Sequence, residues 1–505
     1  MNRSFIRFIL GYIVGFMGLF LLLPLLVALI YREEAWQAYA IVAVPCLIIG
    51  LINGRHKPKS TVFYLKEGFF CTGASWVLLS LIGAVPLFLT EEIPNFIDAI
   101  FESVSGFTTT GASILWDVES LSHASIFWRS FTHLVGGMGV LVFLLAVIPL
   151  AGGGGGSQFN LMRAESPGPS VGKLVPKLKT TAQILYGIYL GLAVIQLILL
   201  LFGGMTFFEA INTAMSTAGT GGFGFYSDSM ASFSPYCQWV IAIFMFIFGT
   251  NFNFYYLILF GHIREAFKME EVRVYALITL AATTIITINI LGDCAGLFDA
   301  VTKALFQVTS LQSSTGFSTA DFALWPQTSR CVLVILMFIG ACAGSTGGGM
   351  KVSRFVIMGK SVHKELRSYI HPRSVRPIIM DDKPVAHEVI RSNNVFFGTF
   401  LLIYFISVFL VSFENLDFGT LFTAVISCMC NMGPGMSLVG PMENYGFLSW
   451  LSKLVLIVDM LAGRLELFPI LMLFHPSIWH DLTTKHQGKI KKLRHAGKIN
   501  IKKKY

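Results

Sequence analysis

Long apolar segments alternate with short polar ones along the whole chain. The apolar segments are about as long as a helix that crosses a bilayer, which needs about 20 residues. The clearest of them are Phe8–Tyr31, Trp36–Ile52, Phe69–Leu89, Phe131–Leu150, Ile184–Phe202, Trp239–Gly261, Val274–Leu291, Val332–Gly344, Val395–Phe413 and Trp450–Phe474. Because a helix satisfies its own backbone hydrogen bonds in lipid, this pattern predicts about ten membrane-spanning helices.

A weaker pattern recurs four times between the spans. Apolar stretches of about 10 residues, too short to cross a bilayer, cover Ile97–Ser105, Phe207–Ser216, Leu297–Ser310 and Phe418–Ser427. Each stretch follows one span and precedes another, so the predicted unit is span, short re-entrant helix, polar turn, span. Two full spans return the chain to its starting side. All four units therefore share one orientation, which argues against an inverted-repeat transporter.

The four polar turns share a sequence motif. Each has a serine six residues before a glycine, as in Ser105/Gly111, Ser216/Gly222, Ser310/Gly316 and Ser427/Gly433. The residue two before each glycine is small and polar, namely Thr109, Thr220, Ser314 and Asn431. One such pair would carry no information. Four of them at the same place in a hydropathy repeat predict four copies of one pore loop.

The expected fold is an all-α polytopic membrane protein. It has four pseudo-symmetric span–pore-loop–span repeats around one pore, plus two N-terminal helices. The expected divisions are 1–60 for the leading helices, 61–165, 166–268, 269–372 and 373–478 for the four repeats, and 479–505 for a basic cytoplasmic tail.

Composition and charge agree with a membrane protein. Hydrophobic residues make up 54% of the chain and charged residues 13%, whereas soluble domains have about 25% charged residues. Basic clusters follow the second, fourth, sixth and eighth spans, at Arg55, Lys57, Lys59, Lys173, Lys177, Lys179, Arg264, Lys268, Lys360, Lys364 and Arg367. This positive-inside pattern predicts that both termini are cytoplasmic. Juxtamembrane basic segments usually meet anionic lipid or a cytosolic partner, so no nucleic-acid partner is expected.

The turns have the chemistry of a cation filter. A turn embedded in the membrane must hide or use its backbone polar groups. Carbonyl oxygens around one axis can replace the water shell of a dehydrated cation, and glycine allows the close approach. The turns contain no acidic ring, which favours a monovalent ion. The expected ion-contacting residues are Thr110, Gly111, Gly221, Gly222, Thr315, Gly316, Met432 and Gly433, supported by Thr109, Thr220, Ser314 and Asn431.

This four-fold plan, with its single glycines Gly111, Gly222, Gly316 and Gly433, resembles the Trk/Ktr/HKT superfamily of potassium transporters. The similarity is greatest to the bacterial TrkH/TrkG branch and covers nearly the whole chain. Members that favour sodium commonly have Ser at the first glycine, so the resemblance implies potassium as the substrate and no cofactor. The fourth turn departs from the others, since Met432 replaces Thr or Gly and Pro434 follows. The TrkH branch has a similar Asn-x-Gly-Pro-Gly there.

The resemblance also implies an assembly. It implies a homodimer with one pore in each chain, located in the bacterial inner (plasma) membrane. It further implies a cytosolic nucleotide-binding regulatory subunit of the TrkA type that controls the gate. The basic loops around Lys360–Arg376 and the basic tail are the candidate docking surfaces.

A glycine-rich segment interrupts the eighth span. Glycine costs about 1 kcal/mol per residue in a helix, and irregular backbone at membrane depth occurs only inside protein or beside water. We therefore expect a mobile loop under the filter, formed by Gly344, Ser345, Thr346, Gly347, Gly348 and Gly349. It resembles the intramembrane loop of the Trk family, which acts as a gate. A plain packing kink is the alternative. A phosphate loop is rejected, because no strand precedes the segment and the G-K-[S/T] motif is absent.

Arg464 lies inside the last span. Charges within spans are costly and usually functional. Arg464 resembles the pore-facing arginine of the family, which opposes the gate loop and raises a barrier to cations. The alternative is a local ion pair with Asp459 or Glu466, and Lys351 could serve the same region.

Other functions find less support in the sequence. A coupled secondary transporter would show paired intramembrane acids and an inverted repeat, and neither is clear. No metal-ligand cluster or nucleophile–base pair stands out in the spans, so the chain is not expected to be an enzyme. Cys428 and Cys430 form a C-x-C without a histidine cluster, which argues against zinc. His123 and His133 are expected to be structural and to lack partners.

Overall fold

The computed structural model describes residues 1–55, 64–139, 178–372 and 376–483. The regular secondary structure of this part of the chain is helical, apart from two strands of two residues each, β1 (Ile379–Met380) and β2 (Lys383–Pro384). The predicted all-α fold is therefore confirmed. The expected basic tail from residue 484 on, the basic residues at 57, 59, 173 and 177, and the end of the span expected over 131–150 lie outside the described residues.

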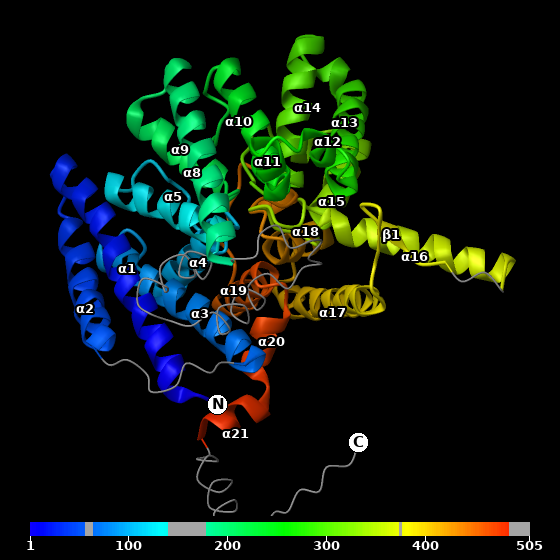
Figure 1. Ribbon diagram of the computed structural model, residues 1–505. Coiled ribbons are helices and arrows are strands. Elements are labelled where there is room, and N and C mark those ends of the chain that lie inside the picture. Colours follow the sequence, from blue (N-terminus) through cyan, green and yellow to red (C-terminus); the bar gives the residue numbers. More distant parts are fainter. Residues whose placement is uncertain (56–63, 140–177, 373–375, 484–505) are drawn as a thin grey trace, which may run out of the picture.

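Two leading helices form a hairpin at the edge of the molecule. Helices α1 (Arg3–Tyr31) and α2 (Trp36–Arg55) lie side by side, at the left of Figure 1. Gly15 and Gly50 face each other at their contact, where a Cβ built on Gly15 would lie 2.8 Å from the Gly50 Cα. The two glycines thus allow the two backbones to approach closely, as small residues do between membrane helices.

Beyond α2, the described residues repeat one order of elements four times. A long helix comes first in each unit, in the order α3 (Leu65–Leu89), α8 (Leu178–Phe202), α13 (Glu270–Ile290) and α17 (His387–Val411). A shorter helix, here called the pore helix, follows as α4 (Phe96–Phe107), α9 (Phe207–Ala218), α14 (Leu297–Gln312) and α18 (Phe418–Met429). A third helix closes each unit as α5 (His123–Gly137), α10 (Pro235–Gly249), α15 (Gln327–Ile339) and α19 (Trp450–Arg464).

Polar residues begin three of the pore helices. Asn95 caps α4 through a hydrogen bond that its Oδ1 accepts from the Ile97 N–H at 2.9 Å. Thr206 and Glu209 form a reciprocal capping box at the start of α9, and Asp417 accepts from the Thr420 N–H at 2.9 Å at the start of α18. Such caps satisfy N–H groups that have no partner inside a helix.

Breaks follow the third helix in three units. The chain bends by 92° between α10 and α11 (Phe252–Leu259). A loop separates α15 from α16 (Val352–Ile370), and positive φ angles of 52° and 70° at Glu466 and Leu467 separate α19 from α20 (Phe468–Phe474). The sequence predicts only the middle break. Within the predicted spans Trp239–Gly261 and Trp450–Phe474 the helix is interrupted although the apolar pattern continues, so nothing in the sequence indicates these two breaks.

The breaks leave backbone groups that pair with other units. The carbonyl oxygen of Gly249 accepts from the Cys342 N–H at 3.0 Å, and that of Phe248 accepts from the Thr346 N–H at 3.4 Å. Both donors lie in the loop after α15. Helix interruptions are tolerated at membrane depth when neighbouring segments satisfy the freed groups in this way.

Several helices have the length and apolarity of membrane spans. In the described residues these are Arg3–Tyr31, Trp36–Arg55, Leu65–Leu89, Ala182–Phe202, Glu270–Asp293 and His387–Glu414, and the bent pair α10–α11 passes the same test. Their outer faces expose large apolar side chains, such as Leu26, Leu277 and Phe409. The molecule is therefore a multi-pass membrane protein.

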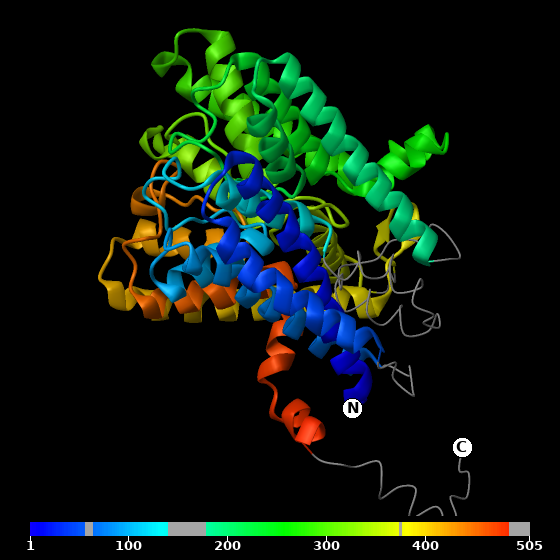
Figure 2. The same cartoon turned by 90° about the vertical axis from the view of Figure 1, so that its left-hand side faces the viewer.

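The remaining helical elements are short. They are α12 (Ile263–Ala266), α21 (Pro476–Thr483) and the 3₁₀ turns η2 (Leu291–Asp293), η3 (Phe322–Leu324), η4 (Ser412–Glu414) and η5 (Ser437–Val439). Helix α16 projects away from the bundle, at the right of Figure 1. Figure 2, turned by 90°, places α21 below the bundle, near the N-terminus.

Candidate functional site

All four pore helices end in the same backbone turn. Thr109, Thr220, Ser314 and Asn431 have left-handed φ angles of 55°, 53°, 61° and 55°. The next N–H in each turn donates to the carbonyl of the motif serine five residues earlier, at 2.8 to 2.9 Å, in the pairs Thr110–Ser105, Gly221–Ser216, Thr315–Ser310 and Met432–Ser427. This is a Schellman motif, which ends a helix with one left-handed residue. The small polar residue of the motif is thus the one that adopts the left-handed conformation at the end of the pore helix.

The four motif glycines form a closed ring. Gly111, Gly222, Gly316 and Gly433 have φ angles of 78°, 80°, 87° and 91°. A Cβ built on any of them would lie closer than 3.0 Å to a carbonyl oxygen of the next loop, in the pairs Gly111–Gly221, Gly222–Thr315, Gly316–Met432 and Gly433–Thr110. Each loop therefore packs against the next, and the fourth packs against the first. Residues far apart in sequence therefore meet at one place.

Backbone carbonyl oxygens in this ring lack hydrogen-bond donors. Among the described residues, no donor reaches the carbonyl oxygens of Thr110, Gly111, Gly221, Gly222, Thr315, Gly316 or Met432. Only the Gly433 oxygen accepts hydrogen bonds there. Buried backbone carbonyls are normally paired. Seven oxygens are thus available to water or to a cation at one place.

The four left-handed residues, each two positions before a ring glycine, have different side-chain partners. Asn431 Nδ2 donates to Thr110 Oγ1 and to the Met460 carbonyl, both at 2.9 Å, which joins the fourth loop to the first. Ser314 Oγ accepts from the Gly348 N–H, and Thr220 Oγ1 donates to the Gly219 carbonyl at 2.6 Å. Thr109 Oγ1 has no hydrogen-bond partner in the described part of the chain. The repeat thus has a common backbone but unequal side chains.

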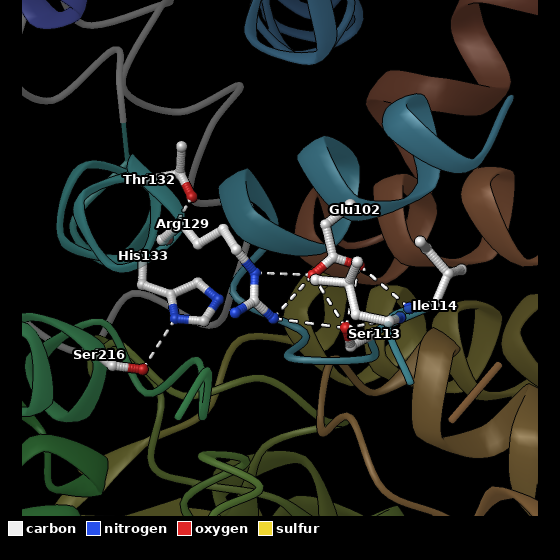
Figure 3. A network of polar contacts seen from close by, with 8 residues as sticks. Glu102, Ser113, Ile114, Arg129, Thr132, His133 and Ser216 are labelled. Atoms are coloured by element: carbon white, nitrogen blue, oxygen red, sulfur yellow. Dashed lines mark hydrogen bonds and ion pairs between the residues drawn. The ribbon is translucent and has the colours of Figure 1, made fainter. Parts of the chain in front are cut away.

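A buried ion pair supports the first loop from behind (Figure 3). Arg129 contacts Glu102 Oε1 through Nε and Nη2, both at 2.8 Å, and the two side chains are at most 2% exposed. The same carboxylate accepts from Ser113 Oγ at 3.0 Å and from the Ile114 N–H at 3.1 Å. Burying a charge is tolerated only with such pairing. The pair therefore fixes the chain just after Gly111.

The second loop is held by the same helix, α5. The Arg129 guanidinium lies 4.0 Å from the ring centre of Phe223, the residue after Gly222. His133 stacks on Phe223 at 4.3 Å, and its Nδ1 lies 3.0 Å from Ser216 Oγ (Figure 3). The expectation that His133 lacks partners is thus wrong. It is also wrong for His123, whose Nδ1 lies 2.8 Å from a Glu33 oxygen.

The glycine-rich segment lies directly under the ring. It runs without helix from Gly340 to Lys351, and Gly340, Gly344, Gly349 and Lys351 have positive φ angles. A Cβ built on Gly347 would lie 2.6 Å from the Ser313 carbonyl oxygen. The Gly349 N–H donates to the Cys430 carbonyl at 2.9 Å. This segment, the intramembrane loop, therefore packs against the third and fourth turns.

Arg464 joins the intramembrane loop to the first repeat. Its Nη1 donates to the Thr346 carbonyl at 2.8 Å, and its Nη2 donates to the carbonyls of Gly136 and Gly137 at 2.5 and 2.6 Å. The carboxylates considered as local partners have other contacts. Glu466 pairs with Arg354, and Asp459 accepts from Ser407 Oγ at 2.7 Å. Lys351 Nζ donates to the Gly347 carbonyl, also within the loop.

Sequence reasoning missed Glu271, which anchors both ends of the intramembrane loop. One of its oxygens accepts from the Ala343 N–H at 2.6 Å and from the Ser353 N–H at 3.1 Å. Its other oxygen lies 3.5 Å from Asn251 Nδ2, at the break after α10. Glu271 is 4% exposed. The only sequence signal was an acidic residue at the start of an apolar helix, which ordinarily indicates a favourable helix-dipole position.

An all-helical fold with several apolar spans around four inward turns defines a multi-pass membrane transport protein. Residues 37–481 match the family model TrkH, described as a cation transport protein. The chain therefore belongs to the TrkH family of cation transport proteins. The family is not one of enzymes.

Named relatives match along nearly their whole length. The chain is 35% identical over 474 residues to the Trk system potassium uptake protein TrkH of Salmonella typhimurium, covering 91% of this chain and 96% of the relative. It is 32% identical over 493 residues to TrkG of Escherichia coli K12, covering 95% and 100%. The crystal structure of the potassium transporter TrkH from Vibrio parahaemolyticus superimposes with a TM-score of 0.84 at 30% identity, covering 95% and 100%.

Proposed function

We propose that this chain takes up potassium through the ring of carbonyl oxygens formed by its four pore loops. The observation that supports this most directly is the close packing of four left-handed glycines beside carbonyls that lack donors. Such oxygens can replace the hydration shell of a monovalent cation. The four turns contain no acidic side chain, which favours a monovalent ion over a divalent one. The relatives' names as potassium uptake proteins agree with this substrate.

The intramembrane loop and Arg464 form the gate in this proposal. The loop lies under the third and fourth turns, and Arg464 ties it to the end of α5 in the first repeat. A fixed positive charge beside the ion path raises the energy of a passing cation. The loop residues Gly344, Ser345, Thr346, Gly347, Gly348 and Gly349 must move for the path to open.

The gate is controlled from the cytosol in this proposal. The chain acts as a homodimer in the bacterial inner membrane, with one pore in each chain and both termini in the cytoplasm. A nucleotide-binding subunit of the TrkA type acts on the loop from that side. Lys360 on α16 supports such a route, since it contacts Glu270 at 2.5 Å and the Ile379 carbonyl of the β1–β2 hairpin at 2.6 Å. Glu270 is next to Glu271, which anchors the loop.

Cation uptake into liposomes tests the proposed substrate. Purified protein is expected to take up potassium or rubidium faster than sodium. Gly111→Ser is expected to reduce this preference by about tenfold, which corresponds to about 1.4 kcal/mol, because the added side chain displaces the Gly221 carbonyl. Equal uptake of potassium and sodium by the parent protein contradicts the filter assignment.

Glu271→Gln tests the anchoring of the gate loop. The carbonyl oxygen of a glutamine is uncharged, so it accepts more weakly from Ala343 and Ser353, and the amide nitrogen cannot accept from Asn251. Losing a hydrogen bond to a charged group costs about 1.5–3 kcal/mol. We expect potassium leak through the purified chain to increase several-fold. Glu265→Gln, at an exposed site on α12, is the control and is expected to leave the leak unchanged.

A further inference from the structure

The carbonyl of Gly433 differs from the seven other carbonyls of the ring. It accepts hydrogen bonds from Ser427 Oγ at 2.6 Å and from the Tyr445 hydroxyl at 2.8 Å. A carbonyl oxygen has two lone pairs, so both are used. An oxygen bonded in this way is a poor ligand for an ion. The described residues place no donor on the corresponding carbonyls of Gly111, Gly222 and Gly316.

The motif serines explain part of this asymmetry. Ser310 donates to the carbonyl of Phe317, one residue beyond the third glycine, at 2.6 Å. Ser216 pairs with His133, and Ser105 Oγ has no hydrogen-bond partner among the described residues. Only Ser427 donates to the glycine of its own motif. The fourth turn therefore orients the Gly433 carbonyl differently from the corresponding carbonyls of the other turns. Pro434 follows Gly433 directly in the sequence.

Tyr445 supplies the second donor from outside the motif. It is 2% exposed, and its N–H donates to the Ser113 carbonyl in the first loop at 2.8 Å. Its ring lies 5.7 Å from that of Phe101 on the first pore helix. The hydroxyl is thus fixed by two contacts with the first repeat. The position of the fourth loop's carbonyl consequently depends on the first loop.

We propose that Tyr445, together with Ser427, holds the Gly433 carbonyl away from the ion path and thereby sets the affinity of the filter for its ion. The fourth loop then offers one carbonyl fewer than each of the other three. This inference rests on the proposed function, because it assumes that the ring binds the transported cation. Conduction needs binding strong enough for entry and weak enough for exit. Withdrawing one carbonyl oxygen from the filter weakens ion binding and favours exit of the ion.

Tyr445→Phe tests this role because it removes the hydroxyl and keeps the ring. With one donor lost, the Gly433 carbonyl can turn toward the ion. We expect the half-saturating potassium concentration for uptake into liposomes to fall about fivefold, the factor for a hydrogen bond of about 1 kcal/mol. The maximal rate is expected to fall as well, since a more tightly bound ion leaves more slowly. Ser427→Ala is expected to change both quantities in the same direction.

Tyr404→Phe is the matched control. Tyr404 is also buried in the fourth repeat, and its hydroxyl also donates to a backbone carbonyl, that of Phe422 at 3.0 Å. It is expected to leave both kinetic quantities unchanged. Parental kinetics in both Tyr445→Phe and Ser427→Ala would overturn the inference, as would an equal change in Tyr404→Phe. Gel filtration verifies that each variant is folded. A parent protein without potassium preference would instead contradict the proposed function.

Discussion

Gly222→Ala is expected to reduce potassium uptake by about tenfold or more. A left-handed alanine costs about 1–2 kcal/mol, and a steric clash adds to this cost. Gly222 has a φ of 80°, and an added Cβ would lie closer than 3.0 Å to the Thr315 carbonyl oxygen. That oxygen belongs to the neighbouring loop of the ring. The substitution therefore displaces a carbonyl that we assign to the ion. Rubidium uptake into liposomes measures the effect.

Gly187→Ala and Gly191→Ala provide matched controls for this substitution. Both glycines lie in α8, and a Cβ built on either has no atom within 4 Å. Alanine also favours a helix over glycine by about 1 kcal/mol, so these variants are expected to fold and transport like the parent. A Gly222→Ala protein that is present in the membrane in normal amounts and transports normally would contradict the close packing of the ring.

The sequence predicts the ring because its signal is repeated. One serine–glycine pair has no meaning alone, but four pairs at equal places in the hydropathy pattern indicate a common turn. The structure supplies the reason for the motif: a left-handed residue at Thr109 and its three equivalents ends the pore helix, and the glycine two residues later allows the next loop to approach. These requirements are local, so the sequence expresses them locally.

The supporting contacts could not be predicted in this way, because they join residues far apart in the chain. Arg464 contacts carbonyls 118 and 328 residues away. Glu102 and Arg129 each stand in an apolar segment, and nothing local indicates that they pair. The break at Glu466 was also hidden, since apolar residues continue on both sides of it.

The side-chain asymmetry of the ring was partly visible in the sequence. Met432 and Pro434 distinguish the fourth turn from the other three. The sequence did not indicate Tyr445, which lies twelve residues beyond Gly433 and donates to its carbonyl. Tyr445 lies outside the repeated motif and has no equivalent in it. Pseudo-symmetry thus predicts the backbone of the site better than its chemistry.

Arg464→Ala is expected to increase potassium flux through the purified chain by about tenfold or more. The guanidinium donates to the carbonyls of Thr346, Gly136 and Gly137, and a hydrogen bond to a charged group contributes about 1.5–3 kcal/mol. The substitution removes the link between the loop and α5, and it also removes a positive charge next to the proposed ion path. Deleting Gly347–Gly349 is expected to increase the flux in the same way. Rubidium uptake without any added partner measures both.

Arg464→Lys separates the two effects of the arginine. A lysine keeps the charge but lacks the planar fork that reaches several carbonyls at once. If the charge alone forms the barrier, Arg464→Lys conducts like the parent; if the link to the loop matters, its flux lies between those of the parent and Arg464→Ala. Arg273→Ala is the control, because Arg273 is exposed and donates to the Lys268 carbonyl outside the pore at 3.2 Å. If a folded Arg464→Ala protein and the loop deletion both show parental flux, the gate assignment is contradicted. The loop is then a packing kink, and the gate lies elsewhere in the chain.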